Sequence, residues 1–330
     1  MSKVKSYLGL IKFSHTIFAM PFALIGFFLG LFTFINSRYN SGQWNLNMTI
    51  SLKWDFESDT LPFLENSLAG KLAAGNATIL TVGKYFLLVI LCMVFARSAA
   101  MAFNRYLDRS FDAKNPRTAI REIPAGIIQA NNALLFTIVC SLLFVVCSFF
   151  INQLCFFLSP VALFVVLGYS YTKRFTPLCH LVLGLGLSLA PIGAYLAVTG
   201  RFDLLPILFS LTVLFWVSGF DIIYALQDEE FDKTNKLYSI PAWLGKAKAL
   251  RVSELLHVFS TACVLFGGWL GNFGWLYWLG AIIFIGMLIY QHSIVKPNDL
   301  KRVNIAFMTA NGIASVVFAI FVIADLFINN

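Results

Sequence analysis

Two clusters of acidic side chains, each at the end of a long apolar stretch, carry the most distinctive chemistry in this sequence. The first cluster, in the segment FNRYLDRSFD, contains Asn104, Asp108 and Asp112. At about 100° per helical residue these side chains fall within a sector of about 80°, and Arg97 shares that face. Charged groups at a membrane edge are costly and mark functional sites. One amide and two carboxylates are therefore expected to converge there.

The second cluster, in the segment FDIIYALQDEEFD, repeats this design. Asp221, Asp228 and Asp232 fall within about 40° of one another on a helix, and Tyr224 stands about 60° to one side. About four apolar segments separate the two clusters, so they occupy equivalent ends in the two halves of the chain, as in membrane proteins with internal repeats. We expect the clusters to face each other around one cavity.

Carboxylate and amide oxygens in this number suit Mg²⁺, which completes its octahedron with water and phosphate oxygens. A diphosphate is the natural ligand to bridge such a site. Its remaining charge can be met by Arg117 and Arg121 after the first cluster, and by Lys173 and Arg174 in the segment YSYTKRFTP, because arginine forks match phosphate oxygens. A basic pair after an apolar segment can also be a simple topology signal, and both interpretations of Lys173 and Arg174 stay open here.

The composition places these clusters in a membrane protein. Of 330 residues, 59% are hydrophobic and 12% are charged, which lies far outside the range of soluble proteins. The formal charge of +8 is dispersed over short connections, which argues against nucleic-acid binding. The six cysteines and four histidines are scattered along the chain, so they predict no zinc or redox site.

Apolar runs long enough to cross a bilayer recur along nearly the whole chain. We therefore predict an all-α polytopic membrane protein, with nine transmembrane helices around a central cavity in two pseudo-repeated halves. The polar residues 36–83 are expected to form an insertion outside the membrane, and residues 1–330 a single domain. The nine spans are predicted near residues 14–35, 84–104, 131–151, 154–171, 180–199, 203–224, 254–271, 273–291 and 303–327.

The distribution of basic residues predicts the orientation of these spans. The connections that begin at Arg109, Thr172, Leu226 and His292 carry most of the lysines and arginines. Basic residues resist translocation, so these connections and the N-terminus are expected on the cytoplasmic side, with the C-terminus outside. Both acidic clusters would then face the cytoplasm.

The two clusters are also where this sequence resembles the UbiA-type superfamily of intramembrane prenyltransferases. NRYLDRSFD is similar to the first motif of that superfamily and DIIYALQDEEFD to the second. The resemblance extends to residues 12–23 (KFSHTIFAMPFA), residues 117–126 (RTAIREIPAG) and the segment YTKRFTP. The second motif is most similar to that of 4-hydroxybenzoate polyprenyltransferases and their menaquinone-pathway relatives. This branch implies an enzyme of quinone biosynthesis in a bacterial inner membrane.

The resemblance implies a reaction that agrees with the chemistry of the clusters. Acidic residues would hold Mg²⁺ on a polyprenyl diphosphate, and basic residues would hold the leaving diphosphate. The electron-rich ring of a small aromatic acceptor would then attack the allylic cation. The catalytic candidates are Asp108, Asp228, Tyr224 and Lys173. The metal-ligand candidates are Asn104, Asp108, Asp112, Asp221, Asp228 and Asp232, and the diphosphate-binding candidates are Arg117, Arg121, Lys173 and Arg174.

Water would trap such a cation, so aromatic faces that tolerate positive charge are expected beside it. Tyr224, Tyr169 and Tyr171 are the candidates for this role. The candidates for binding the acceptor are Lys12, His15 and Arg97.

Two departures from the superfamily pattern bear on these assignments. Arg105 stands where many members have an aspartate, and Lys12 and His15 stand where hydroxybenzoate enzymes often have an arginine–proline pair. A naphthoate, a haem vinyl group or a chlorophyllide are alternative acceptors. A cation-coupled transporter is the alternative of a different class, although its charges usually lie at mid-span rather than at one side. A CDP-alcohol phosphotransferase ranks last, because its Asp-Gly and Ala-Arg elements are absent from the sequence.

Overall fold

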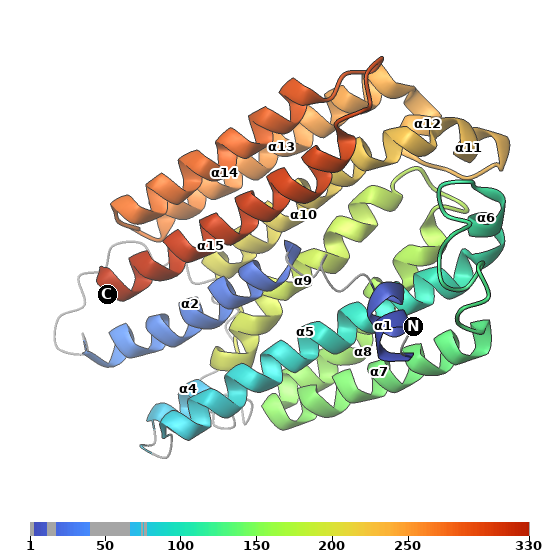
Figure 1. Ribbon diagram of the computed structural model, residues 1–330. Helices are drawn as coiled ribbons and strands as arrows, with labels where there is room; N and C mark the ends of the chain where they lie inside the picture. Colours follow the sequence, from blue (N-terminus) through green and yellow to red (C-terminus); the bar gives the residue numbers. More distant parts are fainter. Residues whose placement is uncertain (1–2, 12–17, 40–66, 74, 76–77, 330) are drawn as a thin grey trace.

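The computed structural model describes residues 3–11, 18–39, 67–73, 75 and 78–329, and this part of the chain is almost wholly helical (Figure 1). Among these residues the only β-type pairing is an isolated bridge between Lys296 and Asp299. The long helices run side by side in a bundle (Figure 1). The prediction of an all-α fold is confirmed.

Eight helices of the described chain are long and apolar enough to cross a membrane, and Met20–Thr33 is a shorter apolar helical stretch. Together they match the nine predicted spans, so the chain is an integral membrane protein. The long helices are α2 (Met20–Tyr39), α5 (Ile79–Leu107), α7 (Ala130–Ile151), α8 (Gln153–Thr172), α9 (Cys179–Thr199), α10 (Leu204–Ala225), α13 (Lys246–Leu270), α14 (Trp275–Ile294) and α15 (Asn311–Ile328), the last preceded by the π-helical turn η3 (Ile305–Ala310).

Short helices occupy the connections. They are α4 (Leu68–Ala73), α6 (Arg109–Lys114), the 3₁₀ turn η2 (Leu226–Asp228), α11 (Glu229–Thr234) and α12 (Ile240–Leu244), and the short helix α1 (Lys3–Leu10) precedes the first long helix. Within the predicted insertion at 36–83, most of the described residues are helical and belong to the end of α2, to α4 and to the start of α5. Residues 40–66 of the insertion lie outside the described residues. Helix α13 begins at Lys246, earlier than the predicted residue 254. The prediction followed the apolar pattern, which excludes the basic residues in the first turns of this helix.

The largest hydrophobic core is aromatic and lies where α2, α10, α14 and α15 meet. Trp216 of α10 packs against Phe22 and Phe284, with ring centroids 5.4 and 5.7 Å away. Phe284 in turn lies 5.3 Å from Phe318, and all four side chains are fully buried. Aromatic pairs at such separations each contribute about 0.5–1.5 kcal/mol beyond the burial of their area. This core fixes α10, the helix that leads into the second acidic cluster.

Helix α9 lies at the centre of the bundle, in contact with α2, α8 and α10. Two glycines permit its close approach to its neighbours. A Cβ atom at Gly26 would collide with the carbonyl oxygen of Pro191, and one at Gly184 with the carbonyl oxygen of Leu214. Any larger residue at these positions would push α9 away from α2 or α10.

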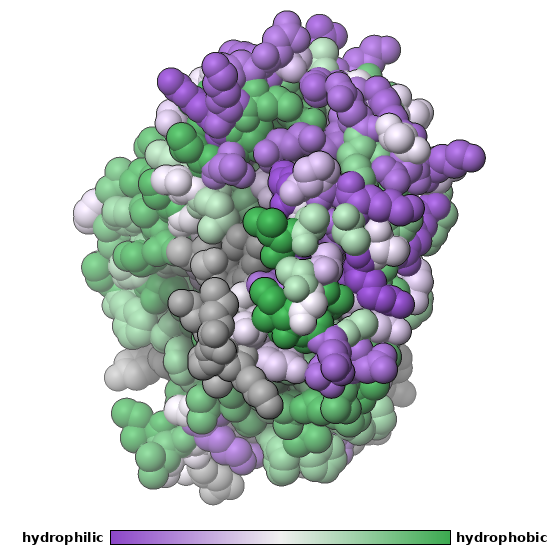
Figure 2. Space-filling view, turned by 45° about the vertical axis from the view of Figure 1, so that its right-hand side comes forward, coloured by the Kyte–Doolittle hydropathy of each residue, from purple (hydrophilic) through white to green (hydrophobic). Residues whose placement is uncertain are grey.

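The polar residues gather at one end of the molecule. Helices α6, α11 and α12 lie together at this end (Figure 1). Figure 2 shows hydrophilic residues over the upper and right-hand parts of the surface and hydrophobic residues over much of the left and lower parts. Side chains such as Phe164 and Ile282 are 78% and 67% exposed, as expected for residues that face lipid. Both acidic clusters lie at the polar end.

Candidate active site

The spacing of the first acidic cluster predicts one continuous helix. In the structure the cluster lies instead at the junction of two helices, α5 and α6. Helix α5 ends at Leu107, Asp108 has φ −87° and ψ 6°, and α6 follows directly. The Asn104 side-chain amide donates to the Asp108 carboxylate over 3.1 Å. These two predicted metal ligands therefore lie together.

Asp112 points to different partners. Its carboxylate accepts a hydrogen bond from Arg121 at 2.6 Å and lies 3.8 Å from the guanidinium of Arg105. Asp112 and Arg105 are both buried. The backbone amides of Asp108 and Asp112 still donate to the carbonyl oxygens four residues earlier, but the Asp112 side chain has other partners than Asn104 and Asp108 have. The convergence of the three residues on one metal ion stays a prediction.

The second acidic cluster is also interrupted. Helix α10 ends at Ala225, and η2 and α11 carry the chain onward through Asp228 and Asp232. Asp221 lies deeper, within α10, where its carboxylate is 2.7 Å from Nδ1 of the buried His180. The 3₁₀ turn changes the helical register, so Asp221 contacts a different set of residues from Asp228 and Asp232.

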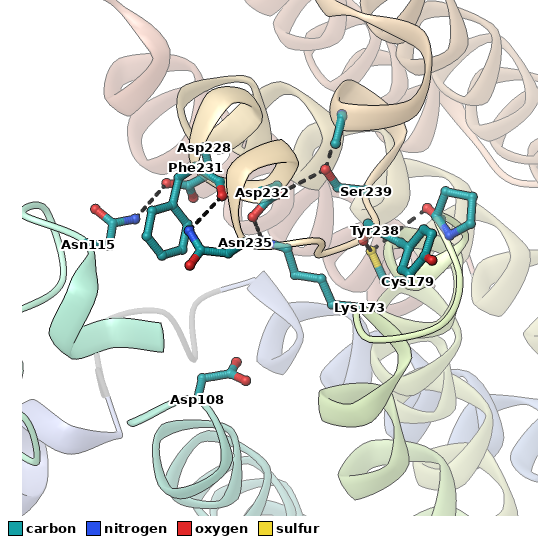
Figure 3. A network of polar contacts seen from close by, with 12 residues as sticks. Asp108, Asn115, Lys173, Cys179, Asp228, Phe231, Asp232, Asn235, Tyr238 and Ser239 are labelled. Atoms are coloured by element: carbon teal, nitrogen blue, oxygen red, sulfur yellow. Dashed lines mark hydrogen bonds and ion pairs between the residues drawn. The ribbon is translucent and has the colours of Figure 1, made fainter. Parts of the chain in front are cut away.

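The connection that follows the first cluster reaches directly to the second. Arg117 holds the Asp228 carboxylate through two nitrogens, at 3.3 and 2.5 Å, and donates to the Tyr224 hydroxyl at 2.9 Å. The Asn115 amide donates to the same carboxylate at 3.3 Å (Figure 3). The connection after the first cluster therefore contacts the second cluster, although the two are far apart in the sequence.

The connection between α8 and α9 also contacts both clusters. Lys173 forms an ion pair with Oδ1 of Asp232 at 2.7 Å, and Oδ2 of the same carboxylate accepts a hydrogen bond from the Ser239 hydroxyl at 2.9 Å (Figure 3). Arg174 lies 3.1 Å from the Asp108 carboxylate. In Figure 3, Asp108 stands on one side of the site and Asp232 on the other. Each of the four predicted diphosphate-binding residues thus pairs with one predicted metal ligand.

These surroundings change the ionisation of the site. Burial raises the pKa of Asp108 from 3.8 to about 6, and the nearby Arg174 opposes that rise. Burial acts to lower the pKa of Lys173, but the Asp232 carboxylate outweighs it and the pKa is raised. Lys173 is therefore held in its charged form, whereas Asp108 exchanges its proton closer to neutral pH than an exposed aspartate does.

An apolar cavity of about 340 Å³ adjoins the site between α5, α7, α8 and α9. Its two large polar residues are Arg97 and Tyr169. Among the described residues, Nε of Arg97 has no hydrogen-bond partner, and no carboxylate lies within ion-pair distance of this side chain. The apolar lining includes Met93, Phe144, Leu158, Val165, Leu187 and Ala194.

A model of the UbiA prenyltransferase family matches residues 66–313 of the chain. The chain belongs to the UbiA prenyltransferase family. The 4-hydroxybenzoate octaprenyltransferase of Tolumonas auensis is 32% identical to it over 234 residues, which cover 71% of this chain and 82% of that relative. The enzyme of the same name from Nitrosospira multiformis is 31% identical over 234 residues, covering 71% and 80%. This UbiA-family chain is therefore an enzyme, a prenyltransferase.

Solved structures share its fold. The apo structure of a UbiA homologue from Aeropyrum pernix K1 has a TM-score of 0.69 and 25% sequence identity, and the match covers 96% of this chain and 98% of that one. A UbiA homologue from Archaeoglobus fulgidus, solved with GPP and Mg²⁺, has a TM-score of 0.67 and 18% identity over 98% and 100% of the two chains. The predicted membership of the family and the predicted helical membrane fold are both confirmed.

The structure of this UbiA-family chain places the remaining predicted residues in different positions. Tyr224 contacts Arg117, and Tyr169 lines the cavity. Tyr171 is 45% exposed and packs against Phe103, and the guanidinium of Arg174 lies 5.4 Å from the centre of its ring. Lys12 and His15 fall outside the described residues.

Three residues at the site were not among the predicted ligands: Asn115, His180 and Ser239. The Ser239 hydroxyl accepts from the amide of Ala242 and caps α12, a role that serine before an Ile-Pro pair often takes. His180 lies at the start of α9, where it is buried and accepts a hydrogen bond from the amide of Ile240 through Nε2 at 3.4 Å. Only Asn115, in a polar connection beside the first cluster, had a signal in the sequence.

Proposed function

We propose that this chain transfers a polyprenyl group from polyprenyl diphosphate to a small aromatic acceptor of the 4-hydroxybenzoate type, in quinone biosynthesis. The observation that carries the proposal is that the connection between α8 and α9 contacts both acidic clusters, through Arg174 to Asp108 and through Lys173 to Asp232. The site lies next to a cavity whose lining is almost wholly apolar. A charged diphosphate and a long hydrocarbon tail need these two environments side by side.

The donor set suits Mg²⁺, because it consists of carboxylate and amide oxygens. Two buried carboxylate oxygens, Oδ2 of Asp112 and Oδ1 of Asp232, make no hydrogen bond among the described residues, although a basic side chain lies within ion-pair distance of each. In the described chain no group of three or more histidine, cysteine or acidic residues is gathered as a metal site. We infer that Asn104, Asp108, Asp228 and Asp232 would hold the metal once their present partners turn to the substrate.

That exchange of partners is the central step in the use of this site. Arg117 and Lys173 now neutralise Asp228 and Asp232. A diphosphate would offer the same side chains more negative charge, and the guanidinium fork of Arg117 suits its oxygens. The carboxylates would then be released to the metal. When bound, Mg²⁺ neutralises the charge that grows on the departing diphosphate.

The cavity fits the hydrocarbon part of the donor. Its walls come from α5, α7, α8 and α9, and Tyr169 lies among them near the polar end of α8. An apolar cavity excludes the water that would otherwise capture an allylic cation. The electron-rich ring of the acceptor then forms a carbon–carbon bond to the allylic carbon as the bond to diphosphate breaks, and the ring loses a proton.

Arg97 is the residue that we assign to the acceptor. It is a partly buried cation whose Nε is buried, it has no acidic partner among the described residues, and it lies in the wall of the cavity. A cation of this kind is stabilised by an anionic ligand. The carboxylate of a hydroxybenzoate or a naphthoate would supply that charge. This reasoning favours an aromatic acid over a haem vinyl group as acceptor.

The relatives support the same chemistry. Homologous structures from Archaeoglobus fulgidus were solved with DMAPP or GPP and Mg²⁺, and the named relatives are 4-hydroxybenzoate octaprenyltransferases. The named 4-hydroxybenzoate octaprenyltransferases are bacterial, so we place this chain, as one domain, in a bacterial inner membrane with its polar end toward the cytoplasm.

In this orientation the C-terminus lies on the opposite side of the membrane from the cytoplasm. Alkaline phosphatase fused after residue 330 should then be active; an inactive fusion would contradict this orientation.

Product analysis tests the function. Purified protein in detergent would receive Mg²⁺, farnesyl diphosphate and either 4-hydroxybenzoate or a dihydroxynaphthoate, and mass spectrometry would identify the product. We expect a prenylated acid whose formation requires Mg²⁺. If the protein binds the diphosphate but prenylates neither ring, the acceptor assignment is wrong. If it binds no diphosphate, the enzyme assignment of the site is wrong and ion transport becomes the better explanation.

Matched variants test the metal ligands. Asp108→Asn and Asp228→Asn should each lower kcat by about 10²–10³-fold, because each removes a charge that the developing transition state needs. Glu230→Gln is the control, since Glu230 is an exposed acid beside Asp228 on α11. Wild-type rates in both aspartate variants would remove these residues from the metal site.

A further inference from the structure

A buried polar network at the start of α15 takes no part in the proposed chemistry. Its centre is Asn311, which is fully buried. The Oδ1 atom of Asn311 accepts hydrogen bonds from the indole of Trp216 in α10 and the amide of Gln291 in α14, each at 2.8 Å. One side chain therefore ties three helices together.

The other end of the same side chain holds the π-helical turn η3. The Nδ2 atom of Asn311 donates to the carbonyl oxygens of Ala306 and Phe307, at 3.2 and 3.0 Å. A π-helical turn inserts one extra residue into a helix, and such turns are frequent at functional sites. The extra residue changes the direction of the side chains that precede it. Asn311 thus fixes the orientation of Phe307.

Phe307 leads from this network to the active site. Its ring stacks on Tyr224 with a centroid separation of 4.2 Å and an interplanar angle of 30°. Edge contacts to Phe18 and Phe220, with centroids 5.4 and 5.5 Å away, hold the ring from other sides. Tyr224 in turn accepts a hydrogen bond from Arg117, whose guanidinium lies 5.4 Å from the centre of the tyrosine ring.

We propose that Phe307 and Asn311 are positioning residues for the diphosphate-binding Arg117, and that they act through the ring of Tyr224. The proposal rests on the proposed function, because it gives Arg117 a substrate to bind. When diphosphate draws Arg117 away from Asp228, its contacts with the fixed Tyr224 remain. The guanidinium then keeps its orientation while its partner changes, and less side-chain freedom is lost on binding.

Phe307→Leu tests this role because leucine keeps an apolar side chain but removes the aromatic face. The expected result is a three- to tenfold weaker binding of inorganic diphosphate in the presence of Mg²⁺, the range that loss of one aromatic pair gives. Phe318→Leu is the matched control: Phe318 is a fully buried phenylalanine of the same helix that contacts Phe284 rather than Tyr224. Calorimetry on the full-length protein in detergent measures both.

Three further variants separate positioning from general stability. Phe307→Tyr keeps the ring and should restore binding close to that of the wild type. In an Arg117→Ala background, Phe307→Leu should have almost no additional effect, because the group that it positions is gone. Asn311→Leu should weaken diphosphate binding in the same way as Phe307→Leu. The KM for the aromatic acceptor should stay unchanged in Phe307→Leu, Phe307→Tyr and Asn311→Leu.

The outcomes distinguish the two proposals. If wild-type protein binds no diphosphate, the proposed function fails and the role of Phe307 fails with it. If the wild type binds diphosphate and Phe307→Leu binds it equally well, only the positioning role is overturned. Equal losses of diphosphate affinity in Phe307→Leu and Phe318→Leu would also overturn it. So would an effect of Phe307→Leu that is as large in the Arg117→Ala background as in the wild type.

Discussion

The two sides of this bundle are packed very differently. In the most apolar stretch of the span Leu204–Thr234, 61% of the residues are buried, against 11% in Ile79–Leu107 and 11% in Gln153–Thr172. The first span belongs to the aromatic core region, where α2, α10, α14 and α15 meet. The other two are α5 and α8, which with α7 and one side of α9 form the cavity region.

This difference assigns separate tasks to the two regions. The aromatic core region holds α10 in place and so fixes Tyr224 and the second acidic cluster at its end. The cavity region leaves space for a hydrocarbon chain and ends at the first cluster. A rigid support on one side and an open volume on the other suit a reaction in which a flexible tail must move and a charged group must not.

The sharpest test of the comparison is the same substitution in both regions. Phe318→Ala in the aromatic core region should lower the free energy of unfolding by about 3–5 kcal/mol, because it opens a void in a closely packed site. Phe144→Ala in the cavity region should cost much less, since Phe144 already borders empty volume. Thermal unfolding in detergent compares the two variants. Equal losses would show that the two regions are packed alike.

The next effect concerns the acceptor. Arg97→Met should raise the KM for 4-hydroxybenzoate by about 10–100-fold, the loss expected for a hydrogen bond to a charged group. Methionine keeps much of the apolar stem, so stability should not fall. Phenol, which lacks the carboxylate, is the control acceptor and should respond little to the change. A loss that is equal for both acceptors would mean that Arg97 serves the fold alone.

The sequence predicted the fold and most of the charged residues, because apolar length and charge at helix ends are local properties of the chain. It could not predict how the charges pair. Asp112 pairs with Arg121, and Asp221 pairs with His180, whereas Asp228 and Asp232 follow the change of register at η2; nothing in the spacing announces these differences. Contacts such as Arg117 with Asp228 depend on how distant helices pack.

The cavity itself was also beyond prediction, since apolar residues that line a cavity look the same in sequence as those that face lipid.

The third prediction, with a smaller expected effect, tests whether the cavity binds the hydrocarbon tail of the donor. Ala162→Phe should narrow the cavity and raise the KM for a long-chain donor by about tenfold, with little change for dimethylallyl diphosphate. Leu142→Phe is the control, because Leu142 is 61% exposed on the outer face of α7. If both donors respond alike to Ala162→Phe, the tail binds elsewhere.

The smallest effect is a change with pH at the boundary between the two regions. Because the pKa of Asp108 is raised to about 6, the folded protein holds more protons than the unfolded chain between about pH 4 and 6. This group therefore makes the fold less stable as pH rises through that window. Metal binding requires the ionised carboxylate, so Mg²⁺-dependent activity should rise over the same range.

With rising pH the stability of the fold should fall and the Mg²⁺-dependent activity should rise. Removing the positive charge that lowers the pKa of Asp108 tests whether this group controls the activity. In Arg174→Gln the rise in activity should move to higher pH, since Arg174 lowers the pKa of Asp108. Arg109→Gln is the control: Arg109 is exposed and lies over the ring of Tyr106. Initial rates from pH 5 to 8 at saturating Mg²⁺ measure the shift. An unchanged profile in Arg174→Gln would mean that another group controls activity, and that the α8–α9 connection does not set the charge of the first cluster.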